Sequence, residues 1–94
     1  MRLIEQQMSN AVYNKANWSK DDTAVYFNEH NDTSLIRLHG NLIATYKHDG
    51  LYKVIPSYSM FSSWPTRTTA SRLRALGIKA SIKGGEAAID GELV

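Results

Sequence analysis

Three histidines are the first residues of this sequence whose spacing suggests chemistry. His30, His39 and His48 recur at nine-residue intervals, and imidazole is a common ligand of zinc and other transition metals. A zinc site also needs ligands that converge and neighbouring groups that orient them. Because these histidines fall at turns or strand ends of a predicted meander, the sequence favours surface histidines. It predicts no metal site.

Acidic residues provide the next candidate chemistry. Asp21, Asp22, Glu29 and Asp32 could form carboxylate pairs for hydrolysis, which would have to be held at a fixed separation across a cleft. They lie in polar segments typical of turns. The sequence contains no phosphate-binding loop, dinucleotide fingerprint, zinc-protease helix or serine-hydrolase elbow. We therefore expect no catalytic residue, no cofactor and a non-enzymatic protein.

Charge is distributed unevenly along the chain. The whole sequence carries a formal net charge of +2, but residues 51–85 contain no acidic side chain. Six basic residues fall in that stretch, which gives it a local charge of +6: Lys53, Arg67, Arg72, Arg74, Lys79 and Lys83. The basic character is therefore regional.

A binding surface is the functional prediction that this stretch supports. Guanidinium and ammonium groups neutralise phosphates or meet acidic protein surfaces, and aromatic side chains stack on bases or anchor protein interfaces. The alternative is a solvated helix face above core aromatics. The sequence lacks the motifs of sequence-specific nucleic-acid readers. The predicted surface consists of Arg67, Arg72, Arg74, Lys79, Lys83, Tyr58 and Trp64.

Two helices are expected to position these residues. Residues 2–16 place an apolar stripe at three-to-four spacing, which indicates an amphipathic helix. The stripe consists of Leu3, Ile4, Met8, Ala11 and Val12. The second helix spans 66–76, because Thr66 is a good N-cap after Pro65 and Gly77 supplies a left-handed C-cap. Arg67 and Arg74 are expected on its outer face, with Arg72 beside them.

Between the helices the sequence predicts strands. Segments 23–27, 34–38, 42–46 and 51–56 are rich in β-branched and aromatic residues. The turn-forming pairs between them are Asn31–Asp32, Gly40–Asn41 and Asp49–Gly50. Segments 17–22 and 57–63 are expected to be irregular. A terminal hairpin of 79–83 and 87–90 turns at Gly84–Gly85. The predicted fold class is α+β: an antiparallel sheet of four or five strands with the 66–76 helix packed on it.

Length and composition limit the class of protein. Ninety-four residues with 43% hydrophobic and 21% charged side chains are typical of one globular domain covering 1–94. There is no cysteine and no apolar leader segment at the N-terminus, so we expect a cytoplasmic protein without disulfides. The sequence does not determine the oligomeric state.

Two segments resemble a recurring pattern in small proteins of bacteriophages and prophages. Residues 38–46 (LHGNLIATY) match its histidine-glycine-asparagine turn, and residues 64–76 match a tryptophan followed by a threonine-rich cap and a Ser-Arg-Leu helix. Arg74 and Gly77 depart from the pattern. The matching residues are Leu38, His39, Gly40, Asn41, Ile43, Ala44, Trp64, Thr66, Thr68, Thr69, Ser71, Arg72, Leu73, Ala75 and Leu76.

The resemblance implies a small phage-encoded protein in the host cytoplasm. Such a provenance favours an accessory role in which the protein binds and inhibits a host complex, such as a CRISPR-Cas or other anti-phage defence effector. The alternative is a small nucleic-acid-binding protein that uses the basic stretch at residues 53–83.

Overall fold

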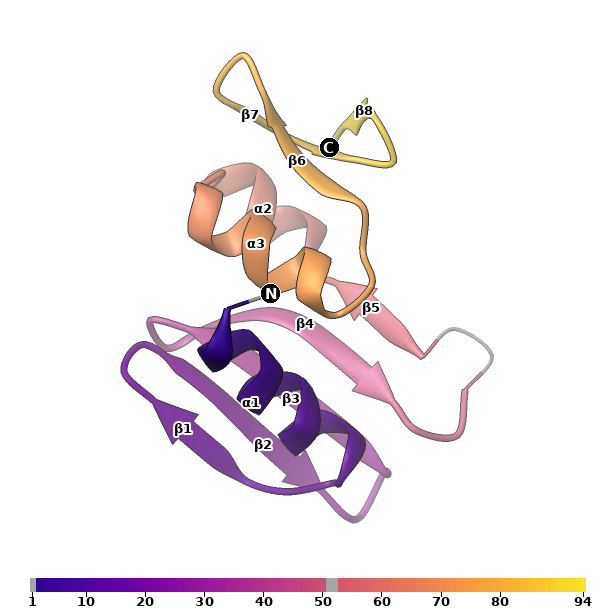
Figure 1. Ribbon diagram of the computed structural model, residues 1–94. Coiled ribbons are helices and arrows are strands. Elements are labelled where there is room, and N and C mark those ends of the chain that lie inside the picture. Colours follow the sequence, from indigo (N-terminus) through magenta and orange to yellow (C-terminus); the bar gives the residue numbers. More distant parts are fainter. Residues whose placement is uncertain (1, 51–52) are drawn as a thin grey trace.

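The computed structural model describes residues 2–50 and 53–94, which form helices and strands in an α+β arrangement (Figure 1). The helices are α1 (Leu3–Tyr13), α2 (Tyr58–Ser63) and α3 (Arg67–Ala75). The strands are β1 (Trp18–Lys20), β2 (Thr23–Asn28), β3 (Thr33–Leu38), β4 (Asn41–Lys47), β5 (Val54–Pro56), β6 (Ala80–Lys83), β7 (Glu86–Ile89) and β8 (Glu92–Leu93). The predicted fold class is confirmed.

The larger sheet is an antiparallel meander in the order β1-β2-β3-β4-β5. Leu38 pairs with Asn41, so β3 and β4 are joined by the two residues His39 and Gly40. Both have positive φ, +52° and +79°, as a hairpin turn that matches the sheet twist requires. The turn residues are therefore not Gly40–Asn41 as predicted, because His39 itself takes the left-handed conformation.

One face of this sheet is covered by α1 and α3 (Figure 1). Alternation along β3 places Ser34, Ile36 and Leu38 in the interior. In α1 the predicted stripe is confirmed for Met8, Ala11 and Val12 but not at its start. Leu3 is 62% exposed, and the charged Glu5 is buried in its place, together with Met8, Ser9, Ala11 and Val12.

The α3 helix begins and ends where the sequence predicts. The Thr66 hydroxyl accepts a hydrogen bond from the Thr69 backbone N–H at 3.1 Å. At the other end, the backbone N–H of Ile78 donates to the Leu73 carbonyl and that of Gly77 to the Arg74 carbonyl. This pair of bonds is a Schellman motif, and Gly77 takes the left-handed conformation with φ +95°.

The end of the chain forms a second antiparallel sheet, β6-β7-β8, which packs on α2 and α3 away from the meander (Figure 1). The predicted Gly84–Gly85 turn is confirmed, with φ of +57° and +81°. Three elements were not predicted: 17–22 contains β1, 57–63 contains α2, and β8 follows the predicted hairpin. Of the predicted strand 51–56, the first two residues lie outside the described part.

The interior is continuous from α1 to the second sheet. Its largest fully buried apolar side chains are Phe61, Met8, Ile36, Leu73 and Val12. Within residues 2–50 and 53–94, no helix is both long enough and apolar enough to cross a membrane.

Candidate binding surface

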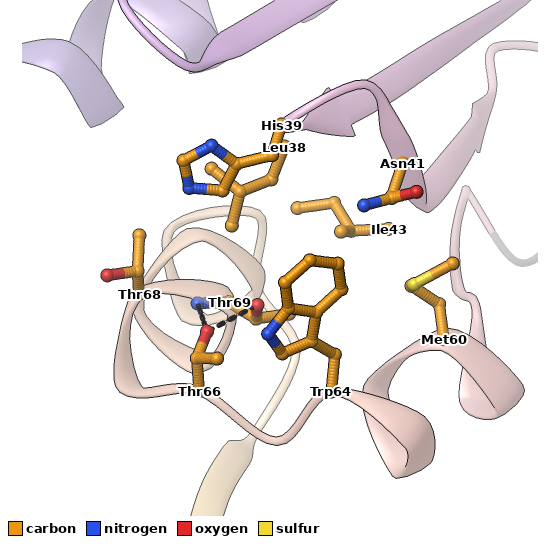
Figure 2. Close-up of a pocket in the computed structure, with 9 residues that line it drawn as sticks. All are labelled: Leu38, His39, Asn41, Ile43, Met60, Trp64, Thr66, Thr68 and Thr69. Atoms are coloured by element: carbon orange, nitrogen blue, oxygen red, sulfur yellow. Dashed lines mark hydrogen bonds between the residues drawn. The ribbon is translucent and has the colours of Figure 1, made fainter.

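A pocket lies between the β3–β4 turn and the segment that joins α2 to α3 (Figure 2). Its volume is about 150 Å³. Residues far apart in the sequence converge on it from the sheet and from the helices: Leu38, His39, Asn41, Ile43, Met60, Trp64, Thr66, Thr68 and Thr69. With one exception, Met60, these residues belong to the two segments that resemble the phage pattern.

The pocket is apolar at its base and carries an exposed aromatic at its edge. Leu38 and Ile43 are buried, whereas Trp64 is 51% exposed. The threonine hydroxyls of the α3 cap are largely engaged with each other, since Thr66 Oγ1 and Thr69 Oγ1 lie 2.7 Å apart. The arrangement therefore suits an apolar group more than a charged one.

A second, shallower depression lies on another side of α3 and is strongly basic. It is lined by Arg2, Arg67, Arg74, Ser71, Ser81, Ala70 and Ile82, and its volume is about 330 Å³. All three arginines are exposed. The predicted residues Arg67 and Arg74 therefore line one depression, together with Arg2, which was not predicted.

The other predicted surface residues line neither of these two sites. Lys79 and Asp90 line a neighbouring shallow depression, which shares Arg74 and Ser81 with the basic one. The Lys83 ammonium donates to the Gly91 carbonyl at 2.8 Å. Tyr58 is 52% exposed on α2 and does not line the pocket. The predicted basic surface is thus divided among several places.

Arg72 corrects the prediction, because it is buried and cannot belong to an exposed surface. Only 4% of the residue is accessible. Its Nη1 donates to Glu5 Oε2 at 2.9 Å, and its Nε donates to the Thr23 hydroxyl at 3.1 Å. The Ser71 hydroxyl donates to the same carboxylate oxygen of Glu5. Arg72 therefore connects α3 to α1 and to the start of β2.

The network continues to the edge of the pocket. Asp22 Oδ1 accepts a hydrogen bond from the Thr23 hydroxyl at 3.0 Å, and Asp22 Oδ2 lies 3.4 Å from Nε2 of His39. Polar contacts therefore run from the buried pair Glu5–Arg72 to His39, a residue that lines the pocket. This chain of contacts fixes the position of the β3–β4 turn relative to the helices.

Glu5 has a lowered pKa. Burial alone would raise the pKa of this carboxyl above 4.5, but hydrogen bonds from Ser71 and Arg72 and the positive charges of Arg72 and Arg2 together hold it below that value. The folded state therefore binds this proton less readily than the unfolded chain. The resulting stabilisation is present above pH 4.5 and is lost as the pH falls through the folded pKa.

Acid unfolding tests this contribution. We expect the free energy of unfolding of the wild type to fall more steeply below pH 4.5 than that of Glu5→Gln, by at most about 1.4 kcal/mol per pH unit for one proton. Urea titrations at several pH values give both slopes. The slopes are the readout, since Glu5→Gln also lowers stability at every pH by leaving Arg72 without its carboxylate. Equal slopes would contradict the assignment.

The histidines occupy three different surroundings. His48 Nε2 lies 2.9 Å from the Ser34 hydroxyl, and its ring packs against Phe27 and Tyr46. His39 faces Asp22, and His30 is exposed in a turn. Among residues 2–50 and 53–94, no group of three or more histidine or acidic side chains is arranged to hold a metal ion.

Comparison with known proteins assigns the chain to a family. No curated protein and no solved structure matches the chain. A family model described as Kyanoviridae Gp96 protein matches residues 1–91, nearly the whole sequence, and it supports the phage origin that the resemblance implied. This phage-encoded chain belongs to the Kyanoviridae Gp96 protein family.

Proposed function

We propose that this phage protein is a non-enzymatic binding protein that attaches to a host protein complex in the cytoplasm and inhibits it. The proposed class of target is a CRISPR-Cas or other anti-phage defence effector. The single observation that carries the binding role is the apolar pocket at His39 and Trp64. The phage origin of the family supports the choice of a host target.

The size of the pocket defines what it would receive. Sites for drug-sized molecules usually enclose roughly 300–1,000 Å³, whereas this pocket encloses about 150 Å³. An apolar cavity of about that volume accommodates a benzene-sized group. The expected guest is therefore one apolar or aromatic side chain projecting from the partner.

The exposed aromatics support a protein partner. Trp64 and Tyr58 are about half exposed and come from the same α2–α3 region, with Met60 between them in sequence. Tryptophan, tyrosine and methionine are enriched at protein interfaces, and tryptophan often dominates their energetics. Inhibition would follow from steric occupation of a functional surface of the target.

The test is a tagged capture from the bacterial host, with and without nuclease, followed by affinity measurement on the purified partner. Trp64→Ala is expected to weaken the complex about 30-fold, which corresponds to a loss of about 2 kcal/mol. Tyr26→Ala is the matched control, because Tyr26 is 50% exposed but lies on β2, outside the pocket. The affinity of Tyr26→Ala for the partner should stay within twofold of the wild-type affinity.

Two results would contradict the proposal. If Trp64→Ala and Tyr26→Ala bind the partner equally, the pocket is not the binding site. If the captured material disappears with nuclease, the protein binds nucleic acid, and affinity should then fall linearly with salt on a log-log plot. A packed protein interface loses much less affinity in salt.

A further inference from the structure

The basic depression on α3 is built from two helices and the second sheet. Arg67 and Arg74 lie two turns apart on α3, Arg2 is the N-cap residue of α1, and Ser81 comes from β6. The pocket of the proposed function is lined by other α3 residues, Thr68 and Thr69. The depression is therefore a separate site with its own chemistry.

Its positive charge is only partly offset by the residues around it. No acidic side chain lines the depression, and within residues 2–50 and 53–94 none of its three arginines takes part in a salt bridge. Glu5, which accepts a hydrogen bond from Ser71, is paired with Arg72 but also attracts Arg2 electrostatically, so it offsets part of the charge. Three like charges around one hollow repel each other, so a bound anion would be favourable there.

The donors are partly held in place before any ligand arrives. Arg74 Nη1 donates to the Ala80 carbonyl at 2.9 Å, which leaves other N–H groups of this guanidinium for a ligand. Ser81 lines the same hollow, whereas the Ser71 hydroxyl already donates to Glu5. Guanidinium groups bind phosphate oxygens in pairs of parallel hydrogen bonds, which a lysine ammonium does not offer.

We propose that this depression binds a small phosphate monoester, with Arg2, Arg67 and Arg74 as the anion ligands. A carboxylate carries one negative charge, whereas a phosphate monoester carries about −1.5 to −2 at pH 7 and three acceptor oxygens. The second charge suits a site of three arginines. The volume of about 330 Å³ leaves space for the ester group beside the phosphate.

The experiment is an NMR titration that follows the arginine side-chain Nε–H signals. The ligands are inorganic phosphate, adenosine 5′-monophosphate, adenosine, and an oligothymidine that carries only phosphodiesters. We expect saturable shifts with phosphate and with the monophosphate, and none with adenosine. Phosphate alone binding as tightly as the monophosphate would assign the site to free phosphate, whereas tighter monophosphate binding assigns it to the ester.

Charge-removal variants make the assignment specific. Arg67→Gln combined with Arg74→Gln is expected to weaken phosphate binding at least about tenfold, since two charged donors are lost. The pair Lys47→Gln and Lys53→Gln removes the same charge from exposed positions outside the depression and should change affinity less than twofold. If the double variant does not fold, the single variant Arg67→Gln takes its place in the phosphate titration. Trp64→Ala should retain phosphate binding, which separates this test from that of the proposed function.

Protonation of the ligand gives an independent signature. A phosphate monoester takes up its second proton near pH 6, so its affinity should fall between pH 7.5 and pH 5.5, while that of sulfate should not. The proposal would be overturned if the lysine double variant lost as much phosphate affinity as the arginine double variant. Tighter binding of oligothymidine than of the monophosphate would also overturn it. So would changes in the arginine Nε–H chemical shifts that are no larger with phosphate than with chloride.

Discussion

Replacing Arg72 with methionine is expected to lower the free energy of unfolding by about 3 to 5 kcal/mol. The substitution keeps a long side chain but leaves the Glu5 carboxylate buried without its cation. Arg72 and Glu5 are each only about 5% exposed at the side chain, so water cannot replace the lost partner. A domain of this size is stable by about 5–15 kcal/mol, so the variant should lose a large share of its stability. Urea unfolding followed by circular dichroism measures the change.

Two further variants separate the charge from the packing. Arg67→Met makes the same substitution at an exposed position of the same helix and should change stability by no more than about 0.5 kcal/mol. Glu5→Met combined with Arg72→Met removes both charges and should recover most of the loss, because apolar replacements of a buried ion pair are often neutral. If the double variant were as unstable as Arg72→Met, the unpaired carboxylate would not be the cause.

The position of Arg72 shows where charge patterns in a sequence mislead. Thr69, Arg72, Leu73 and Leu76 follow the i, i+3, i+4, i+7 spacing of a buried helix face, and all four are buried. Glu5, Met8, Ser9 and Val12 follow the same spacing in α1 and are also buried. Each of the two buried stripes contains one charged residue, and the two charges have opposite signs, which indicates an ion pair. Counting basic residues along the chain instead assigned Arg72 to the surface.

Most of the fold was predictable because local signals and tertiary packing agree. The β2–β4 strands combine β-branched residues with alternation, and α3 carries both of its caps in the sequence. The β1 strand has three residues and is stabilised by pairing with β2, a contact that no local pattern contains. The pocket was not predictable for the same reason. Leu38 and Trp64 meet through the packing of α2 and α3 on the sheet.

Phe61→Ala is the second substitution for which we expect a loss of about 3 to 5 kcal/mol. Phe61 is 1% exposed and is the buried residue of α2, which has six residues and no side-chain N-cap. A helix of that length is not stable alone, and its serines add little helix propensity. The contacts of Phe61 therefore hold α2 against β4 and β7. Tyr58→Ala, on the same helix but 52% exposed, should change stability by no more than about 0.5 kcal/mol.

The same substitution tests how the pocket is supported. Met60 lies in α2 and Trp64 directly follows it, so both pocket walls depend on the helix that Phe61 anchors. In a Trp18→Phe background, Trp64 is the remaining tryptophan, and acrylamide quenching of its fluorescence reports its exposure. Phe61→Ala should increase quenching under conditions where circular dichroism still shows a folded protein, whereas Tyr58→Ala should not. Unchanged quenching would mean that α3 and the β3–β4 turn hold Trp64 without α2, and the pocket would then be a rigid feature of α3 and the sheet.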